Sequence, residues 1–318
     1  MPEILQNLRQ VPRMAFPSGF EPLAYRLGGG RSILLGYGNT GFCIAEHFDI
    51  ITYSNRKYKF FPERNQNMTV SEFYQFLCER IPAELTLESD RDGMSCCPDP
   101  QKEVQKVLIC LDVTTAAIDE AIEEGCEVIL AHHPMLHGGI DSVQATQYRG
   151  NKLIRLISHG IAVMSFHTRL DGVDGGVSDM LADLVGVKNT VKICEKGICR
   201  LGELEAPLPA AVFAQKIKEA LGAPFVEYSD TGRLIRKVAV GGGSVNSYIP
   251  YAIAAGADAL VGGEIGYHNL TDSADMGISL FAAGHFYTEN PVCARLFELT
   301  AEAGLLPIIT FSNCVESV

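Results

Sequence analysis

The stretches AIEEGCEVILAHH (residues 121–133) and AIAAGADALVGGE (residues 252–264) align with each other without a gap. Each has a helical apolar pattern, then a glycine that ends the helix, then an apolar run typical of a buried strand. The stretches that precede them, KVLICLDVT (106–114) and KVAVGGGSV (237–245), align at the same offset. The sequence therefore predicts that one strand–helix–strand unit occurs twice.

Further elements continue this alternation of strands and helices. Helices are predicted over residues 68–82 (with a Thr or Ser N-cap), 151–160 and 177–186, and a strand over residues 161–168. This order indicates an α/β fold with mostly parallel sheets. We expect two pseudo-repeated α/β halves, about residues 68–190 and 200–318. We also expect a site in the cleft between them, because sites collect at the carboxyl ends of parallel strands.

The composition excludes several classes of protein. The chain has 318 residues, 47% of them hydrophobic and 20% charged, which is enough for a substantial core. A formal net charge of -12 argues against a nucleic-acid surface, and no apolar run approaches the ~20 residues of a membrane span. The N-terminus lacks the apolar core of a signal peptide, and no two of the 10 cysteines form a CxxC pair. We expect a cytoplasmic protein with reduced thiols and no membrane or nucleic-acid partner.

Residues 1–67 differ from the rest of the chain. Lys and Arg outnumber Asp and Glu there, whereas residues 68–318 are strongly acidic. The glycines of YRLGGGRSILLGYGNTGF (25–42) lack the strand–loop–helix order of a phosphate-binding loop. We interpret residues 1–67 as an N-terminal extension that either packs poorly or is not native, since the regular pattern begins at Met68. Residues 68–318 are then the α/β domain.

Histidines and carboxylates gather at the predicted carboxyl ends of strands. Six of the eight histidines lie in AHHPMLH (131–137), SFHTRLD (165–171), GGEIGYH (262–268) and AAGHFYTE (282–289). Clustering of this kind indicates one site rather than scattered structural histidines. Imidazole and carboxylate together suit divalent zinc, manganese, iron or nickel, and they do not decide among these ions.

The spacing of these residues fits ligands that are shared between two ions. His285 and Glu289 are four residues apart, so they face one ion if the chain turns helical after the strand. Asp171 lies in a glycine-bounded loop, where it could bridge two ions. Four or five ligands divided between two divalent ions leave open positions, which a catalytic site requires. The alternative is a buried polar network without metal, in which every group would need a partner.

Other residues of these segments have roles that the sequence leaves open. His167 and His268 are candidates for proton transfer or for holding a ligand in place, and equally for a structural role. Glu264 is a candidate general base for an activated water. His137 either faces the substrate or is solvated.

The GGGS stretch after the predicted strand KVAV has two interpretations. The backbone N–H groups of Gly242, Gly243 and Ser244 are a candidate phosphate-binding site if a helix starts there. The alternative, which we favour, is a tight turn that packs against its neighbour. Asp112, at the corresponding place in the first repeat, is expected to cap a helix or to orient a metal-bound histidine.

Taken together, AHHP, HTRLD followed by GGV, GGEIGYH and GHFYTE resemble the Nif-three-like family, whose members are often called type 2 GTP cyclohydrolase I. The resemblance covers roughly residues 68–318. It implies an α/β protein with a dinuclear metal centre between two similar halves, commonly assembled as a toroidal homohexamer. It also implies that Asp171 bridges two ions, within the ligand set His132, His133, Asp171, His285 and Glu289.

The sequence departs from the family's pattern at two places. Arg169 stands where the family usually has Asn, and SDRDGM (89–94) stands in place of a Trp-Asp-Asn-x-Gly-Leu segment. That segment lies near the cleft in relatives, so the resemblance says less about substrate specificity. Residues 1–67 have no counterpart in the family.

Two functions fit these features. The first is a metal-dependent hydrolase, in which two ions activate water and clamp an anionic small molecule such as a nucleotide. The resemblance implies ring opening of GTP with release of formate. The second is a non-catalytic metal-binding regulatory or interaction protein. Such a protein needs neither open coordination positions nor a general base, and it should present an exposed apolar patch.

Overall fold

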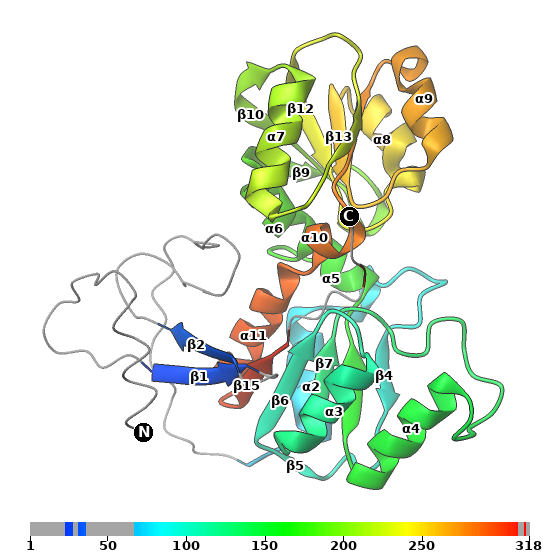
Figure 1. Ribbon diagram of the computed structural model, residues 1–318, viewed down its shortest axis with the longest axis vertical. Helices are drawn as coiled ribbons and strands as arrows, with labels where there is room; N and C mark the ends of the chain where they lie inside the picture. The colour runs from blue at the N-terminus through cyan, green and yellow to red at the C-terminus, as the bar shows by residue number, and fades with distance from the viewer. Residues whose placement is uncertain (1–22, 28–30, 36–66, 311–314, 316–318) are drawn as a thin grey trace, which may run out of the picture. The chain divides into compact units, whose positions relative to one another are not determined.

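The computed structural model describes residues 23–27, 31–35, 67–310 and 315 (Figure 1). Contacts divide the chain into two units, Met1–Lys59 and Phe60–Val318. In the first unit, β1 (Leu23–Leu27) pairs antiparallel with β2 (Arg31–Leu35). The rest of the predicted extension lies outside the described residues, and its poor packing or non-native origin stays a prediction.

The second unit is an α/β structure built on two sheets. The first sheet has the strand order β15-β6-β7-β8-β4, with β15, β6, β7 and β8 parallel and β4 antiparallel at the edge. The central strands are buried along nearly their whole length, as expected of parallel strands that are covered on both faces. The strands are Gly93–Cys96 (β4), Lys106–Cys110 (β6), Val128–Ala131 (β7), Ala162–Ser165 (β8) and Leu306–Ile309 (β15).

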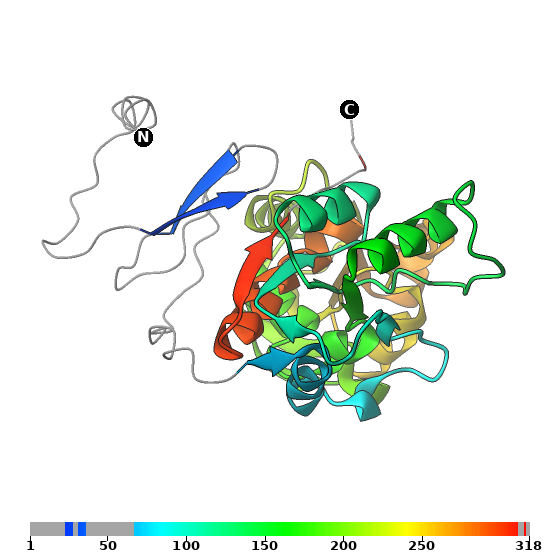
Figure 2. The same ribbon diagram turned by 90° about the horizontal axis from the view of Figure 1, so that it is seen from below.

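Helices cover both faces of the first sheet (Figure 2). The apolar side chains of α2 (Val70–Arg80) and α11 (Val292–Glu302) pack in one core with alternate residues of β6, β7 and β8. The other alternate residues pack with α3 (Thr115–Glu123) and α4 (Tyr148–His159). Thr69 is the N-cap of α2 and forms a capping box with Glu72, which confirms the predicted cap.

The second sheet has the strand order β11-β14-β13-β12-β10-β9. β12, β13 and β14 are parallel, whereas β9, β10 and β11 join antiparallel, so this sheet is mixed rather than mostly parallel. Its strands are Val187–Lys192 (β9), Arg200–Leu208 (β10), Glu227–Ser229 (β11), Ile235–Val240 (β12), Ala259–Gly262 (β13) and Ser279–Ala282 (β14). Its two faces are covered by α6 (Val177–Val185) with α7 (Ala210–Leu221), and by α8 (Ile249–Ala254) with α9 (Tyr267–Met276).

Residues that align in the two halves of the sequence have the same strand partners. Val107 pairs with Val128 in the first sheet, and the aligned Val238 pairs with Ala259 in the second. The end of the chain does not follow the predicted division, because β15 returns to the first sheet and pairs with β6. In space, therefore, residues 292–309 belong with the first sheet.

No described helix of the chain is long and apolar enough to cross a membrane. Several short elements complete the second unit. These elements are β3 (Met68–Thr69), β5 (Glu103–Val104), α5 (Thr168–Gly172), α10 (His285–Glu289) and three 3-10 turns at Ala83–Leu85 (η3), Glu195–Gly197 (η4) and Asn246–Tyr248 (η5).

A buried arginine braces the segment that contains α5. Arg200, at the start of β10, is 2% exposed, and its Nε lies 2.7 Å from Oδ1 of Asp179 in α6. Its Nη2 donates to the carbonyl of Gly172, the last residue of α5, at 3.2 Å, and its Nη1 donates to the carbonyl of Gly197. Arg200 therefore fixes the backbone beside Asp171.

We expect Arg200→Met to lower the free energy of unfolding by about 3 kcal/mol, because it leaves a half-buried carboxylate and buried carbonyls without their partner. Lys188→Met removes an exposed ion pair with Asp183 and should change that free energy by less than about 0.5 kcal/mol. Urea titration followed by circular dichroism measures both variants. An equal decrease in the free energy of unfolding of the two variants would contradict a stabilising role for Arg200.

Candidate metal centre

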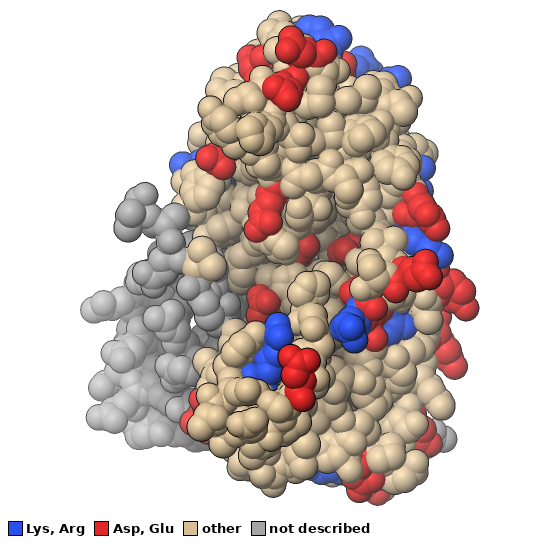
Figure 3. Space-filling model, turned by 90° about the vertical axis from the view of Figure 1, so that its right-hand side faces the viewer, with Lys and Arg blue, Asp and Glu red and all other residues tan. Residues whose placement is uncertain are grey.

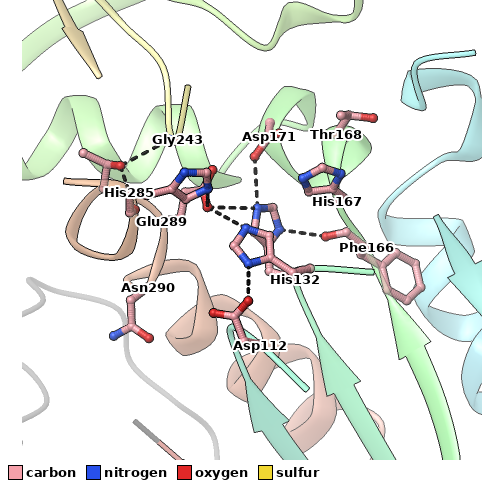
Figure 4. Close-up of polar contacts among 12 residues, drawn as sticks. Asp112, His132, Phe166, His167, Thr168, Asp171, Gly243, His285, Glu289 and Asn290 are labelled. Atoms are coloured by element: carbon pink, nitrogen blue, oxygen red, sulfur yellow. Dashed lines mark hydrogen bonds and ion pairs between the residues drawn. The ribbon is translucent and has the colours of Figure 1, made fainter. Parts of the chain in front are cut away.

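Polar side chains that follow strands of both sheets converge at one place (Figure 4). His132 and His133 follow β7, and Asp171 lies in α5, which follows β8. From the second sheet, His285 and Glu289 lie in α10, shortly after β14. Because the chain does turn helical after β14, in α10, these two side chains lie on one face. The structure thus brings the five predicted ligands together.

Glu289 is at the centre of this group. Its side chain is almost completely buried, and its Oε2 lies 2.8 Å from His133 Nε2, 2.9 Å from His285 Nε2 and 3.8 Å from His132 Nε2. Burial alone would raise the pKa of Glu289, but its interactions with the three histidines outweigh burial and hold this pKa well below its usual range. Glu289 is therefore a carboxylate.

His132 and Asp171 face each other with acceptor atoms. His132 Nδ1 lies 2.9 Å from the carbonyl oxygen of Phe166, which can only accept, so Nδ1 carries the proton and Nε2 of the neutral ring carries a lone pair. That Nε2 lies 3.5 Å from Asp171 Oδ1, and neither atom has a hydrogen-bond partner in the described part of the chain. Two buried acceptors in this arrangement fit a shared cation.

The pKa shifts of this pair agree with that fit. Burial lowers the pKa of His132, which keeps the imidazole neutral and able to act as a ligand. Burial and then the charge of Glu289 raise the pKa of Asp171 well above its usual range. A divalent cation between the two side chains would instead lower the pKa of Asp171, because a cation favours the ionised carboxylate.

His133 is oriented by a second carboxylate. Its Nδ1 donates to Asp112 Oδ1 at 2.8 Å, which leaves Nε2 aimed at Glu289. Burial would lower the pKa of His133, but the hydrogen bonds to Asp112 and Glu289 raise it to about 10. Of the two roles that we considered for Asp112, the structure shows contact with the histidine, since Thr114 is the cap of α3.

His167 stands beside the two adjacent histidines. Its ring centroid lies 5.2 Å from that of His132 and 5.6 Å from that of His133. Its Nδ1 donates to Asp90 Oδ1 at 2.9 Å, and Asp90 Oδ2 accepts from the backbone N and the hydroxyl of Thr168. Burial would raise the pKa of Asp90, but these hydrogen bonds and the charge of His167 lower it. Asp90 thus fixes the direction of the His167 ring.

Among the described residues, three groups of side chains could each hold a metal ion, because one donor atom from every member lies within 4.8 Å of the others. Glu289 belongs to two of them, whereas Asp171 belongs to one. The groups are His132 with Asp171 and Glu289, His133 with His285 and Glu289, and His132 with His133 and His167.

The remaining candidates lie farther from the centre. Glu264 is largely exposed, and its Oε1 lies 3.2 Å from His285 Nδ1. His268 is exposed and stacks edge-on with Tyr267, and His137 is an exposed loop residue. Within the described residues, neither His268 nor His137 makes a hydrogen bond or ion pair with the five predicted ligands. Figure 3 shows one face of the molecule with a hollow near its middle. Acidic side chains lie in and around this hollow.

The GGGS stretch forms a turn that packs against the predicted ligands. Gly243 has φ +57°, its N–H donates to Thr288 Oγ1 at 3.2 Å, and its carbonyl accepts from the N–H groups of Gly263 and Glu264. A Cβ on Gly243 would lie 2.2 Å from Glu289 Oε1, and a Cβ on Gly242 would lie 2.9 Å from Glu289 Cγ. The glycines therefore make room for Glu289, and the N–H of Gly243 already has a partner.

Sequence reasoning missed Asp90 and the partner of Arg169. Arg169 is buried, its Nε lies 2.5 Å from Asp92 Oδ2, and its guanidinium lies 4.1 Å from the centroid of the Phe166 ring. Asp90 and Asp92 both lie in SDRDGM (89–94). This segment and Arg169 are the two departures from the family's pattern, and they contact each other through Asp92. The signal in the sequence was the pair of aspartates in an otherwise unexplained segment.

The strand-end motifs and this geometry agree with a comparison to known families. A model of the Duf34/NIF3 (NGG1p interacting factor 3) family matches residues 68–313. The chain belongs to this family. This confirms the resemblance seen in the sequence.

Relatives of this NIF3 family member are found among curated proteins and solved structures. The GTP cyclohydrolase 1 type 2 homolog of Clostridium perfringens is 31% identical over 242 residues, 74% of this chain and 92% of the relative. That of Clostridium acetobutylicum is 33% identical over 226 residues, 68% and 84% of the two chains. The crystal structure of Staphylococcus aureus hypothetical protein SA1388 has a TM-score of 0.73 at 24% identity and covers 80% of this chain and 100% of that one, so it shares the fold.

We expect Gly243→Ala to reduce bound metal in this NIF3 family member to less than half, because the added methyl group displaces Glu289 and His285. Gly222→Ala is the matched control, since Gly222 has φ +61° and nothing within 4 Å of an added Cβ. Both variants should lose about 1 kcal/mol of stability from the left-handed backbone. Elemental mass spectrometry of the purified proteins measures the metal. Equal metal content in the two variants would contradict the packing argument.

Proposed function

We propose that this protein is a metal-dependent hydrolase with two divalent ions per subunit. The observation that carries the proposal is the buried pair His132 Nε2 and Asp171 Oδ1, two facing acceptors without a hydrogen-bond partner among the described residues. Buried acceptors of this kind are unfavourable unless a cation or proton joins them. The nitrogen and carboxylate donors suit zinc, manganese, iron or nickel.

We assign His132, Asp171 and Glu289 to one ion, and His133, His285 and Glu289 to the other. This assignment revises the expectation that Asp171 bridges, because Glu289 is the carboxylate common to both groups. When bound, such ions supply Lewis acidity that polarises a substrate oxygen and activates water. Three protein groups per ion leave coordination positions open for substrate.

The other residues near the centre would position groups and move protons. Asp112 holds His133, and Asp90 holds His167, so both rings keep one direction. Glu264 is exposed beside His285, where it can accept a proton from an attacking water. His167 is the second candidate for proton transfer, whereas His268 and His137 are too exposed for us to assign them a step.

The substrate class that we propose is a nucleotide such as GTP. Its support is the name of the curated relatives, GTP cyclohydrolase 1 type 2 homolog. The chemistry would be hydrolytic ring opening of the purine. We also propose a homo-oligomer, with a hexamer as the assembly to test by light scattering coupled to gel filtration.

Metal stoichiometry of the full-length protein tests the centre directly. We expect close to two ions per subunit, and below one in Glu289→Gln, because an amide does not replace a shared carboxylate. Glu205→Gln makes the same substitution at an exposed position of β10 and should keep the full complement. A metal content well below one ion per subunit in the parent protein, even after reloading with each candidate metal, would contradict the ligand assignment.

Glu264→Gln separates an enzyme from a non-catalytic metal-binding regulator. We expect its metal content to be unchanged and its turnover of GTP, or of another nucleotide found in a screen, to fall about 100-fold, the effect of losing a general base. Turnover equal to that of the parent protein would remove Glu264 from the mechanism. If the metal-loaded parent turns over none of the nucleotides, the regulatory or interaction role becomes the better interpretation.

A further inference from the structure

Two arginines flank the loop that leaves the metal centre. The segment Pro134–Gly139 directly follows His133 and folds into two successive turns, closed by hydrogen bonds from His137 N to Pro134 O and from Gly139 N to Leu136 O. Arg149, in α4, donates from Nη2 to the carbonyl of His137 at 2.8 Å and from Nη1 to the carbonyl of Gly139 at 3.3 Å. Its guanidinium is therefore held against this turn.

Arg91 approaches the same turn from the segment before β4. Its backbone N–H donates to Asp90 Oδ1 at 2.8 Å, the atom that also accepts from His167 Nδ1, so Arg91 is anchored next to the centre. A Cβ on Gly139 would lie 3.9 Å from Arg91 Nη2, and a Cβ on Gly138 would lie 3.7 Å from Arg149 Nη2. The two guanidiniums thus lie beside successive glycines, and that of Arg149 also lies over the ring of Tyr148, 5.1 Å from its centroid.

These arginines lack the carboxylate partner that most arginines within residues 67–310 have. Within residues 67–310, the guanidinium of Arg91 makes no hydrogen bond or ion pair, and that of Arg149 bonds only to backbone carbonyls. Carboxylates instead pair with Arg80, Arg155, Arg169, Arg200, Arg236 and Arg295. Two guanidiniums without carboxylates at one turn form a local positive charge beside an acidic centre.

We propose that Arg91 and Arg149 form a phosphate-binding subsite next to the metal centre. The inference rests on the proposed hydrolase and adds the place where a phosphate group of its substrate would bind. A guanidinium offers parallel N–H donors that match the oxygens of a phosphate, and it stays charged at every physiological pH. Gly138 and Gly139, both with φ +81°, let such a group approach the turn closely. Lys and Arg side chains lie beside the hollow on the face shown in Figure 3.

Binding of methylenediphosphonate to the metal-loaded, full-length protein tests the subsite. This probe carries phosphate-like groups and has no bond that the centre could hydrolyse, so binding is measured without turnover. By isothermal titration calorimetry we expect Arg91→Gln and Arg149→Gln each to weaken binding about tenfold, and the double variant to weaken it further. Arg233→Gln is the control, because Arg233 also lacks a carboxylate partner within residues 67–310 and bonds only to the Gly277 carbonyl.

Arg91→Gln decides the matter, because its guanidinium makes no contact that the fold needs, whereas Arg149 also holds the turn. Affinity within twofold of the parent protein in Arg91→Gln would overturn the proposal. Malonate that binds as tightly as the diphosphonate would overturn the preference for phosphate. The titration is independent of hydrolysis. Loss of binding in the arginine variants supports the subsite even if no nucleotide is turned over, and unchanged binding rejects it even if GTP is hydrolysed.

Discussion

A buried carboxylate that faces three imidazoles is the constraint on which this structure depends. Removing a carboxylate from water costs several kcal/mol unless opposite charge and hydrogen bonds replace the water. Glu289 obtains them from His133 and His285, and it needs space that only Gly242 and Gly243 leave free. His132 and His133 follow a strand of the first sheet, whereas His285 and Glu289 follow a strand of the second, so the centre exists only if both sheets are held together.

The end of the chain explains how the two sheets meet. Glu289 ends α10, and α11 begins at Val292, only three residues later. Instead of covering the second sheet, α11 buries its apolar side in the core of the first, and β15 then pairs with β6. Hydrophobic burial of α11 in the core of the first sheet therefore places Glu289 close to His132 and His133. In a simple duplication this segment would stay with its own half, and the carboxylate would be displaced from the histidines.

Local patterns made much of this predictable from the sequence. The apolar runs at 106–110 and 128–131 and the glycines that end helices depend on neighbouring residues alone, and the structure has strands and helices there. Clustered histidines at strand ends predicted a single site, because parallel strands end at the same edge. The return of β15 and the antiparallel strands β9, β10 and β11 could not be predicted, since strand order depends on contacts between distant parts of the chain. For the same reason the side-chain contacts of Arg91 and Arg149 could not be predicted from the sequence.

Charge links the two proposals for this protein. Asp112, Asp171 and Glu289 bring three carboxyl groups to the centre, and ionised carboxylates favour cations and oppose an anion within several ångströms. The exposed carboxylate of Glu264 adds to this effect on the side of His285. A phosphorylated substrate can therefore approach only if positive charge compensates, both among the ligands and at the place where the phosphate rests. The histidine and carboxylate set fits the first requirement, because it suits divalent ions. The guanidiniums of Arg91 and Arg149 fit the second, because the described carboxylates neutralise neither of them.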